Sequence, residues 1–277
     1  TWFRVDRGLA LGVMVGALTV GSGLPHLVNG AGGLGWRTVL VVTSVLTVGG
    51  GLVADRLAAD GPHQYPTARF DPRAVRRAFA DRRVRLATAG YFGHMWELYA
   101  MWAWFGAFYV DVLRAGGNTD PTRRASLAAG LVIGIGAVGA IVAGRVSDRR
   151  SRELAAGLPM VVSGALAAVI GFLDEGPPVL VLVLGLAWGL TVVADSAQFS
   201  TVVTEVADQQ YVGTALTVQL ASGFVLTVFT IFLVPVVRDA WGWGAAFAML
   251  APGPLIGSLA MRALALDRRP SARVIVS

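Results

Sequence analysis

Long apolar stretches, separated by short polar turns, run along almost the whole chain. A helix needs about 20 apolar residues to cross the hydrocarbon core of a bilayer, and about eight stretches reach that length. Lipid offers no hydrogen-bond partner to an open sheet edge, so helices are expected here and not strands. The pattern predicts an all-α integral membrane protein, a bundle of about eight transmembrane helices near residues 8–28, 36–54, 86–113, 125–144, 154–173, 177–205, 212–237 and 243–266.

The composition agrees with a lipid environment. Hydrophobic residues make up 55% of the chain and charged residues only 14%, whereas a soluble domain carries about 25% charged residues. So little charge cannot cover a globule of this size, and the lipid bilayer is the expected partner. The absence of cysteine excludes disulfides, thiolate metal sites and a cysteine nucleophile, and no cofactor or metal site is predicted.

Arginine accounts for all 23 basic residues, and its distribution predicts the orientation of the chain. The arginines follow the ends of the apolar stretches, so the net charge of +6 indicates membrane anchoring, and no nucleic-acid partner is predicted. Eight spans place both chain ends on one side, together with the long polar segment 55–85. Cytoplasmic loops are rich in arginine, so both ends are predicted to be cytoplasmic in a multi-pass protein of the cell membrane. Only five arginines fall on the other side: Arg37, Arg114, Arg123, Arg124 and Arg238.

The segment 55–85 is the longest polar interruption, and it contains Pro62, Pro66 and Pro72. Within it, residues 71–85 read either as a short amphipathic helix on the membrane surface or as a solvated linker. The pattern leaves both interpretations open.

The sharpest local motif lies in the turn between the fourth and fifth predicted spans. Residues 144–152 read G-x-x-x-D-R-x-x-R. Gly144 would let two helix ends approach closely, and Asp148 would cap the start of the next helix. Arg149 and Arg152 would hold the turn at the anionic cytoplasmic surface. The other interpretation is ordinary positive-inside charge.

This motif resembles the cytoplasmic signature loop of the major facilitator superfamily. The resemblance implies twelve helices in two six-helix halves, with such a loop between helices 2 and 3 and again between helices 8 and 9. If this copy is the second, residues 1–57 are the last two helices of the N-terminal half, 58–85 the central cytoplasmic loop and 86–277 the C-terminal half. The chain is then expected to be truncated at its N-terminus. The family pattern also implies that Glu205 pairs with arginines of the signature loop. Residues 21–30 match the family's antiporter motif only in a degraded form, so no drug/proton antiporter is predicted.

Ionisable residues inside apolar spans are costly, and they mark candidate functional sites. In the third span, His94 and Glu97 are three residues apart and lie on neighbouring positions of one helix surface. They would either line the translocation path and exchange a proton or form a satisfied polar pair that fixes helix packing. The flanking aromatic residues could wall a cavity: Tyr91, Trp96, Tyr99, Trp102 and Trp104.

A second set of polar residues occupies the sixth and seventh spans. Asp195 and Gln198 fall on one helical face with Thr191 and Glu205. They would serve either the solute path or helix association. Gln219 of the seventh span, with Ser222 nearby, is expected to face the same cavity. No arginine lies in the middle of a predicted span, which argues against an anion such as nitrate.

The six residues 134–139 read G-x-G-x-x-G. In a dinucleotide-binding site, that motif joins a strand to a helix. Here it lies within an apolar span, as does the series Gly8, Gly12 and Gly16. Both patterns therefore predict close helix packing.

These features predict that the protein moves a small solute by alternating access, with protons as the coupling ion. A transporter-like receptor or scaffold without flux fits the same pattern. A membrane-embedded enzyme is the weaker alternative, because the chain has only three histidines and lacks the H-E-x-x-H and G-x-S-x-G motifs.

The predicted orientation has a direct test. A membrane-impermeant reagent applied from outside should fail to label the turn around Asp148, since that turn is expected on the cytoplasmic side. Labelling of this turn from outside would contradict the orientation and the assignment of the spans.

Overall fold

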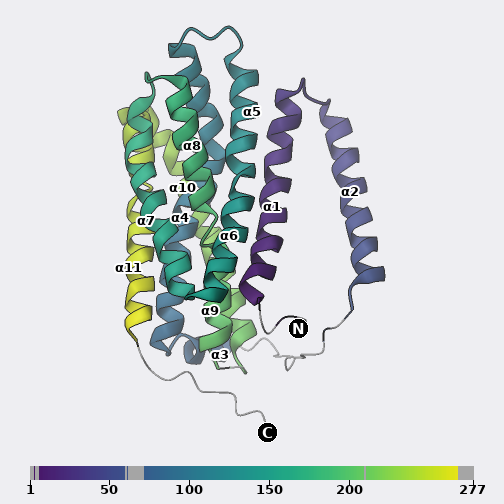
Figure 1. Ribbon diagram of the computed structural model, residues 1–277, viewed down its shortest axis with the longest axis vertical. Helices are drawn as coiled ribbons and strands as arrows, with labels where there is room; N and C mark the ends of the chain where they lie inside the picture. The colour runs from purple at the N-terminus through teal and green to yellow at the C-terminus, as the bar shows by residue number, and fades with distance from the viewer. Residues whose placement is uncertain (1–2, 4–5, 60, 62–71, 209, 268–277) are drawn as a thin grey trace.

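The computed structural model describes residues 3, 6–59, 61, 72–208 and 210–267, and all regular structure in these ranges is helical (Figure 1). The predicted all-α bundle is therefore confirmed. The helices are α1 (Arg7–Gly30), α2 (Trp36–Leu57), α3 (Pro72–Ala78), α4 (Arg82–Ala115), α5 (Pro121–Gly134), α6 (Gly136–Arg149), α7 (Arg152–Ile170), the 3₁₀ turn η1 (Gly171–Leu173), α8 (Pro178–Val192), α9 (Ser196–Val206), α10 (Val212–Ala248) and α11 (Pro252–Leu266).

Six stretches of the described chain are long and apolar enough to cross a membrane: Arg7–Gly30, Trp36–Leu57, Pro121–Arg149, Arg152–Leu173, Pro178–Val206 and Val212–Leu266. Eight were predicted, and two features account for the difference. The last stretch is interrupted at Gly242, where φ is 81°, and its two parts run in opposite directions (Figure 1). Helix α4 has 34 residues, about 50 Å at 1.5 Å per residue, but its polar residues keep it out of the apolar set.

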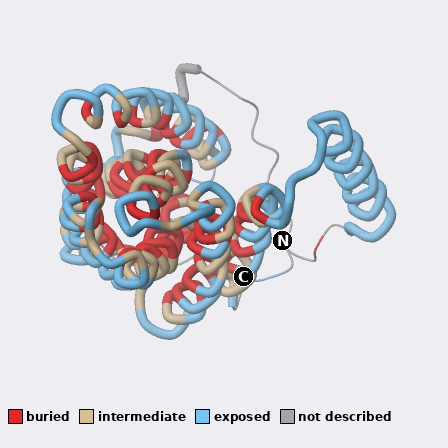
Figure 2. Tube along the Cα trace, turned by 90° about the horizontal axis from the view of Figure 1, so that it is seen from above, coloured by how far each residue is buried: buried red, intermediate tan, exposed pale blue. Residues whose placement is uncertain are grey.

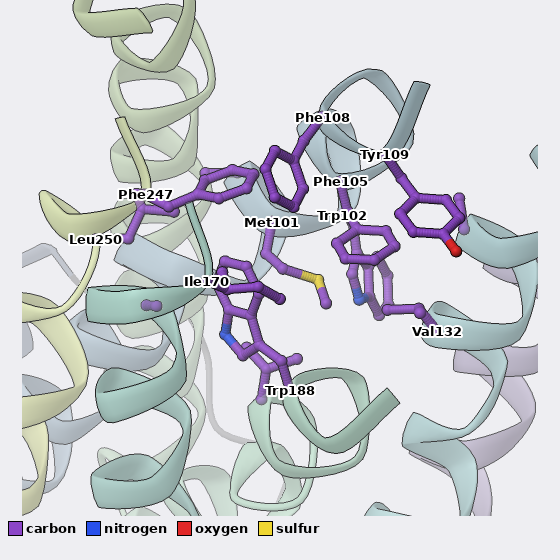
Figure 3. Close-up of a cluster of buried hydrophobic side chains, with 14 of the residues drawn as sticks. Met101, Trp102, Phe105, Phe108, Tyr109, Val132, Ile170, Trp188, Phe247 and Leu250 are labelled. Carbon is purple, nitrogen blue, oxygen red and sulfur yellow. The ribbon is translucent and has the colours of Figure 1, made fainter. Parts of the chain in front are cut away.

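Helix α4 can be polar because other helices surround it. It packs against α5, α8, α9, α10 and α11, and more than half of its residues are buried. Met101 and Phe108 of α4 meet Trp188 of α8 and Phe247 of α10 in a cluster of buried side chains (Figure 3). The rings of Phe108 and Phe247 are edge to face at 5.1 Å, a favourable aromatic geometry.

Two of the membrane-spanning stretches contain a break that the sequence pattern did not predict. The fourth predicted span is divided at Ile135, between α5 and α6, and the sixth at residues 193–195, between α8 and α9. The divided stretches pack against each other through glycine. A Cβ atom on Gly189 would lie 1.8 Å from the carbonyl oxygen of Val132, and one on Gly139 would lie 1.9 Å from that of Leu190. The prediction of close packing around residues 134–139 is thus confirmed.

Helix α1 packs on α5 and α6 along a stripe of buried glycines. A Cβ atom on Gly12 would lie 2.5 Å from the carbonyl oxygen of Ala140, and one on Gly23 would lie 2.8 Å from that of Gly130. Helix α2 stands apart from the bundle (Figure 2), and every one of its residues is exposed. Its apolar surface is suited to lipid or to further helices.

The segment 71–85 combines a short helix with the start of α4. Residue 71 lies outside the described part of the chain. Helix α3 (Pro72–Ala78) packs against α10, and Asp81 caps α4 by accepting a hydrogen bond from the backbone N–H of Arg83 at 2.7 Å. The segment is therefore partly helical and rests on the bundle, so a plain solvated linker does not describe it.

The glycine contact between the divided helices predicts a stability difference between two variants. Gly189→Ala should destabilise the protein by about 1–3 kcal/mol, because the new methyl group overlaps a backbone carbonyl. Gly21→Ala is the matched control, since a Cβ atom there has nothing within 4 Å. The measurement is thermal inactivation in detergent, followed by size-exclusion chromatography. Equal midpoints for the two variants would contradict the packing described here.

Candidate functional site

A cavity of about 380 Å³ lies between α1, α4, α9, α10 and the break between α8 and α9. Its wall is mainly apolar, and among the described residues that line it only His94 and two tyrosines can ionise. A second cavity of about 500 Å³ lies between α6, α7 and α8, and it contains none of the predicted site residues. The first cavity is therefore the candidate site.

His94 and Asp195 form a buried pair beside this cavity. The Nδ1 atom of His94 lies 2.8 Å from Oδ1 of Asp195, and each residue is only 2% exposed. The two atoms are within ion-pair distance without the alignment of a hydrogen bond. Asp195 lies in the break that precedes α9, so the pair connects α4 to an irregular point of the neighbouring stretch. The structure brings together two residues that the sequence places in separate spans.

Glu97 faces a different set of partners. It does not line the cavity, and its Oε1 atom accepts hydrogen bonds from Ser163 Oγ at 2.7 Å and from Trp188 Nε1 at 2.6 Å. These bonds tie α4 to α7 and α8. The arrangement supports the packing interpretation for Glu97, whereas His94 faces the cavity.

The two glutamines are buried away from the cavity wall. Gln198 of α9 accepts a hydrogen bond from Ser147 Oγ of α6, and its Nε2 atom has no partner among the described residues. Gln219 of α10 is fully buried, and both of its amide atoms lack a partner in the same part of the chain. Helix α10 instead presents Leu220 and Phe224 to the cavity. The sequence pattern predicted that Gln219 faces the cavity, whereas the structure places it away from the cavity wall.

The aromatic residues of α4 divide into two groups. Tyr91, Tyr99 and Trp102 line the cavity, as expected. Trp96 and Trp104 do not, and they donate their indole N–H groups to backbone carbonyls in or next to α10, at 3.0 and 2.8 Å. The sequence did not distinguish the two groups because all five lie on one strongly aromatic helix.

The signature loop joins α6 to the start of α1. Asp148 accepts hydrogen bonds from the backbone N–H groups of Gly8 at 2.9 Å and Leu9 at 2.8 Å. The prediction that Asp148 caps the next helix is wrong, because Ser151 occupies that position and accepts from the N–H of Leu154 at 3.0 Å. A carboxylate at a helix N-terminus is favoured by the exposed N–H groups and the helix dipole.

Arg152 holds the signature loop to α9. Its guanidinium group lies 2.7 Å from Asp148 Oδ1 and 3.1 Å from Glu205 Oε1, and it donates to Ser147 Oγ at 2.8 Å. The predicted pairing of Glu205 with a signature-loop arginine is confirmed. Arg149 is exposed at the end of α6.

Gly144 lies where α6 meets α1. A Cβ atom on Gly144 would be 2.4 Å from the carbonyl oxygen of Gly8, so the predicted close approach at this glycine is confirmed. The partner, however, is the first predicted span, and the sequence pattern gave no indication of that pairing.

The family model of the Major Facilitator Superfamily matches residues 1–229. The chain belongs to this superfamily. Its members are multi-pass membrane proteins that carry small solutes, and they are transporters, not enzymes. A search of curated proteins finds no match to this chain.

In this transporter, the sequence pattern did not single out three residues of the site. Ser147, Ser163 and Trp188 complete the hydrogen bonds of Gln198 and Glu97. Serine and tryptophan are common in membrane helices, so only the spatial arrangement identifies these residues. Ser147 directly precedes the signature aspartate Asp148, at a variable position of the motif, so it carries no distinctive signal.

The cap formed by Asp148 predicts a local effect at the start of α1. Asp148→Ala should raise amide hydrogen exchange of Gly8 and Leu9 by a factor of roughly 2–30, which corresponds to about 0.5–2 kcal/mol for a lost cap. Asp81→Ala is the matched control, since it removes a cap confined to α4. Unchanged exchange at α1 in Asp148→Ala would contradict the cap.

Proposed function

We propose that the protein moves a small solute by alternating access, and that the His94–Asp195 pair carries the coupling proton. The observation behind this proposal is the position of the pair, buried between α4 and the α8–α9 break, with His94 lining the cavity and Asp195 behind it. Discontinuous helices are a recurring feature of substrate and ion sites in secondary transporters. The proposal thus assigns both solute and proton to one place in the fold.

The buried pair suits a proton carrier for an electrostatic reason. An isolated charge in a membrane protein is costly, so protonation of one partner changes how strongly the two helices hold each other. Asp195 supplies a carboxyl group and His94 an imidazole, and both side chains can gain and release a proton. The other acid on this part of α4 is Glu97, which Ser163 and Trp188 already bind. A proton at the pair would therefore act mainly on the contact between α4 and α9.

Helix α9 supplies a physical link from the pair to the signature loop. Asp195 precedes its first turn, Gln198 is bonded to Ser147, and Glu205 near its end is paired with Arg152. Arg152 in turn holds Asp148, the cap of α1. A change in the pair can thus reach the contact between α1 and α6 through one short helix.

The division of the chain forms part of the proposal. Residues 1–57 would belong to the N-terminal half, 58–85 to the central cytoplasmic loop and 86–277 to the C-terminal half. The start of α1, the turn between α6 and α7 and the end of α11 lie at the same end of the bundle (Figure 1). With the arginine distribution, this supports a cell-membrane protein with both ends cytoplasmic.

The chain's lack of cysteine allows a test that needs no identified solute. Ser200 lines the cavity, so Ser200→Cys should react with a membrane-impermeant maleimide from either side of oriented proteoliposomes. Lowering the pH from about 8 to about 5 should raise the rate of maleimide labelling from one side of the membrane and lower it from the other. Adding His94→Asn or Asp195→Asn should abolish this pH response.

His26→Asn is the matched control in the same background, because His26 lies in α1 outside the cavity wall and should leave the response intact. Labelling from one side at every pH would contradict alternating access and favour a receptor without flux. A normal pH response in Asp195→Asn would contradict the role of the pair while leaving alternating access in place.

A further inference from the structure

The cavity wall carries almost no charge. Aspartate, glutamate and arginine are absent from the described residues that line it. His94 can become positive there, but Asp195 lies 2.8 Å behind it and supplies the matching negative charge. An anion or cation entering this space would meet no unpaired opposite charge, and an unpaired buried charge is strongly unfavourable.

Three aromatic side chains form a continuous part of the wall. The ring of Tyr99 lies 5.4 Å from that of Trp102 and 5.7 Å from that of Phe224. Leu11 and Met14 of α1 complete the apolar lining on the facing side. Rings at these separations can make both stacked and edge-to-face contacts with an aromatic ligand.

A few hydrogen-bonding groups interrupt the apolar wall. Ser196 and Ser200 line the cavity from α9, and His94 lines it from α4 with its Nδ1 atom directed to Asp195. The indole N–H of Trp102, a residue only 9% exposed, has no hydrogen-bond partner in the described part of the chain. Mainly apolar pockets with a few placed polar groups are typical of sites for small organic ligands, and the volume of about 380 Å³ falls in their usual range.

We infer that this cavity binds an uncharged, mainly apolar solute that carries an aromatic ring and a hydrogen-bonding group. The inference rests on the proposed function, and it specifies the solute class for the same site. The ring packs against Tyr99, Trp102 and Phe224, while the polar group bonds to a serine hydroxyl, to His94 or to the indole of Trp102. The described residues of the wall offer no counter-charge to a charged molecule of the same shape, so such a molecule should bind more weakly.

Three probes with one ring system separate charge from shape: 2-naphthalenemethanol, 2-naphthoate and 2-naphthylmethylammonium. Binding is measured by calorimetry on the full-length protein in nanodiscs, with empty nanodiscs subtracted. The alcohol should bind saturably and at least about tenfold more tightly than either ion. A carboxylate or an ammonium that binds as tightly as the alcohol would overturn the inference, as would an alcohol that shows no saturable binding.

Two variants of α10 place the binding in this cavity. Phe224→Ala removes a ring of the wall and should weaken binding of the alcohol by about 3–10-fold. Phe229→Ala is the matched control, since Phe229 is 65% exposed and lies outside the cavity. Equal affinities in the two variants would overturn the assignment to this site. The charge series on the unmodified protein decides the solute class even if a variant fails to fold.

The outcomes for binding and for transport are distinguishable. Selective binding of the alcohol without a pH response at Ser200→Cys would contradict the transport proposal and support the ligand class. A pH response of Ser200→Cys together with preference for the carboxylate would support transport and overturn the ligand class.

Discussion

The structure depends on the cost of placing charge and unpaired polar groups in hydrocarbon. Helix α4 carries His94 and Glu97 in its buried middle, and neither could face lipid without a large penalty. Five other helices enclose α4, and each of the two residues has a polar partner on a neighbouring helix. The bundle is organised around this one polar helix, which explains why the least apolar long helix is also the most enclosed.

The same constraint relates the breaks, the glycines and the signature loop. A helix break inside a membrane needs protein around it, and the α8–α9 break meets α4 through Asp195. Glycine at positions 139 and 189 brings the divided helices close enough to cover their backbones. At one end of the bundle, Asp148 and Arg152 neutralise each other and hold α1 and α9 to the loop. The short helix α9 therefore joins the His94–Asp195 pair to the ion pairs of Arg152 at the end of the bundle.

Much of the fold follows from the sequence, because apolar length and arginine placement respond to the bilayer itself. The all-α bundle, the signature loop, the Glu205 pairing and the close-packed glycines were all predicted. The breaks at Ile135 and at residues 193–195 were not, since neither contains proline and apolar residues flank both of them. The partner of Asp148 was predicted wrongly, because capping of the next helix is a local rule while the observed partner lies 140 residues away. For His94 and Glu97, spacing placed them together, but only the surrounding helices show that one faces the cavity and the other the core.

The pairing of His94 with Asp195 is the claim on which the functional account depends, and nitrogen NMR of the imidazole ring measures it directly. The chain has three histidines, so a ¹⁵N-histidine-labelled sample gives few signals, and the His94→Asn variant assigns one of them. Asp195→Asn should shift the Nδ1 resonance of His94 and leave that of His26 in place, because the carboxylate lies 2.8 Å from the first ring only. An unchanged His94 resonance in Asp195→Asn would contradict the pair and the account built on it.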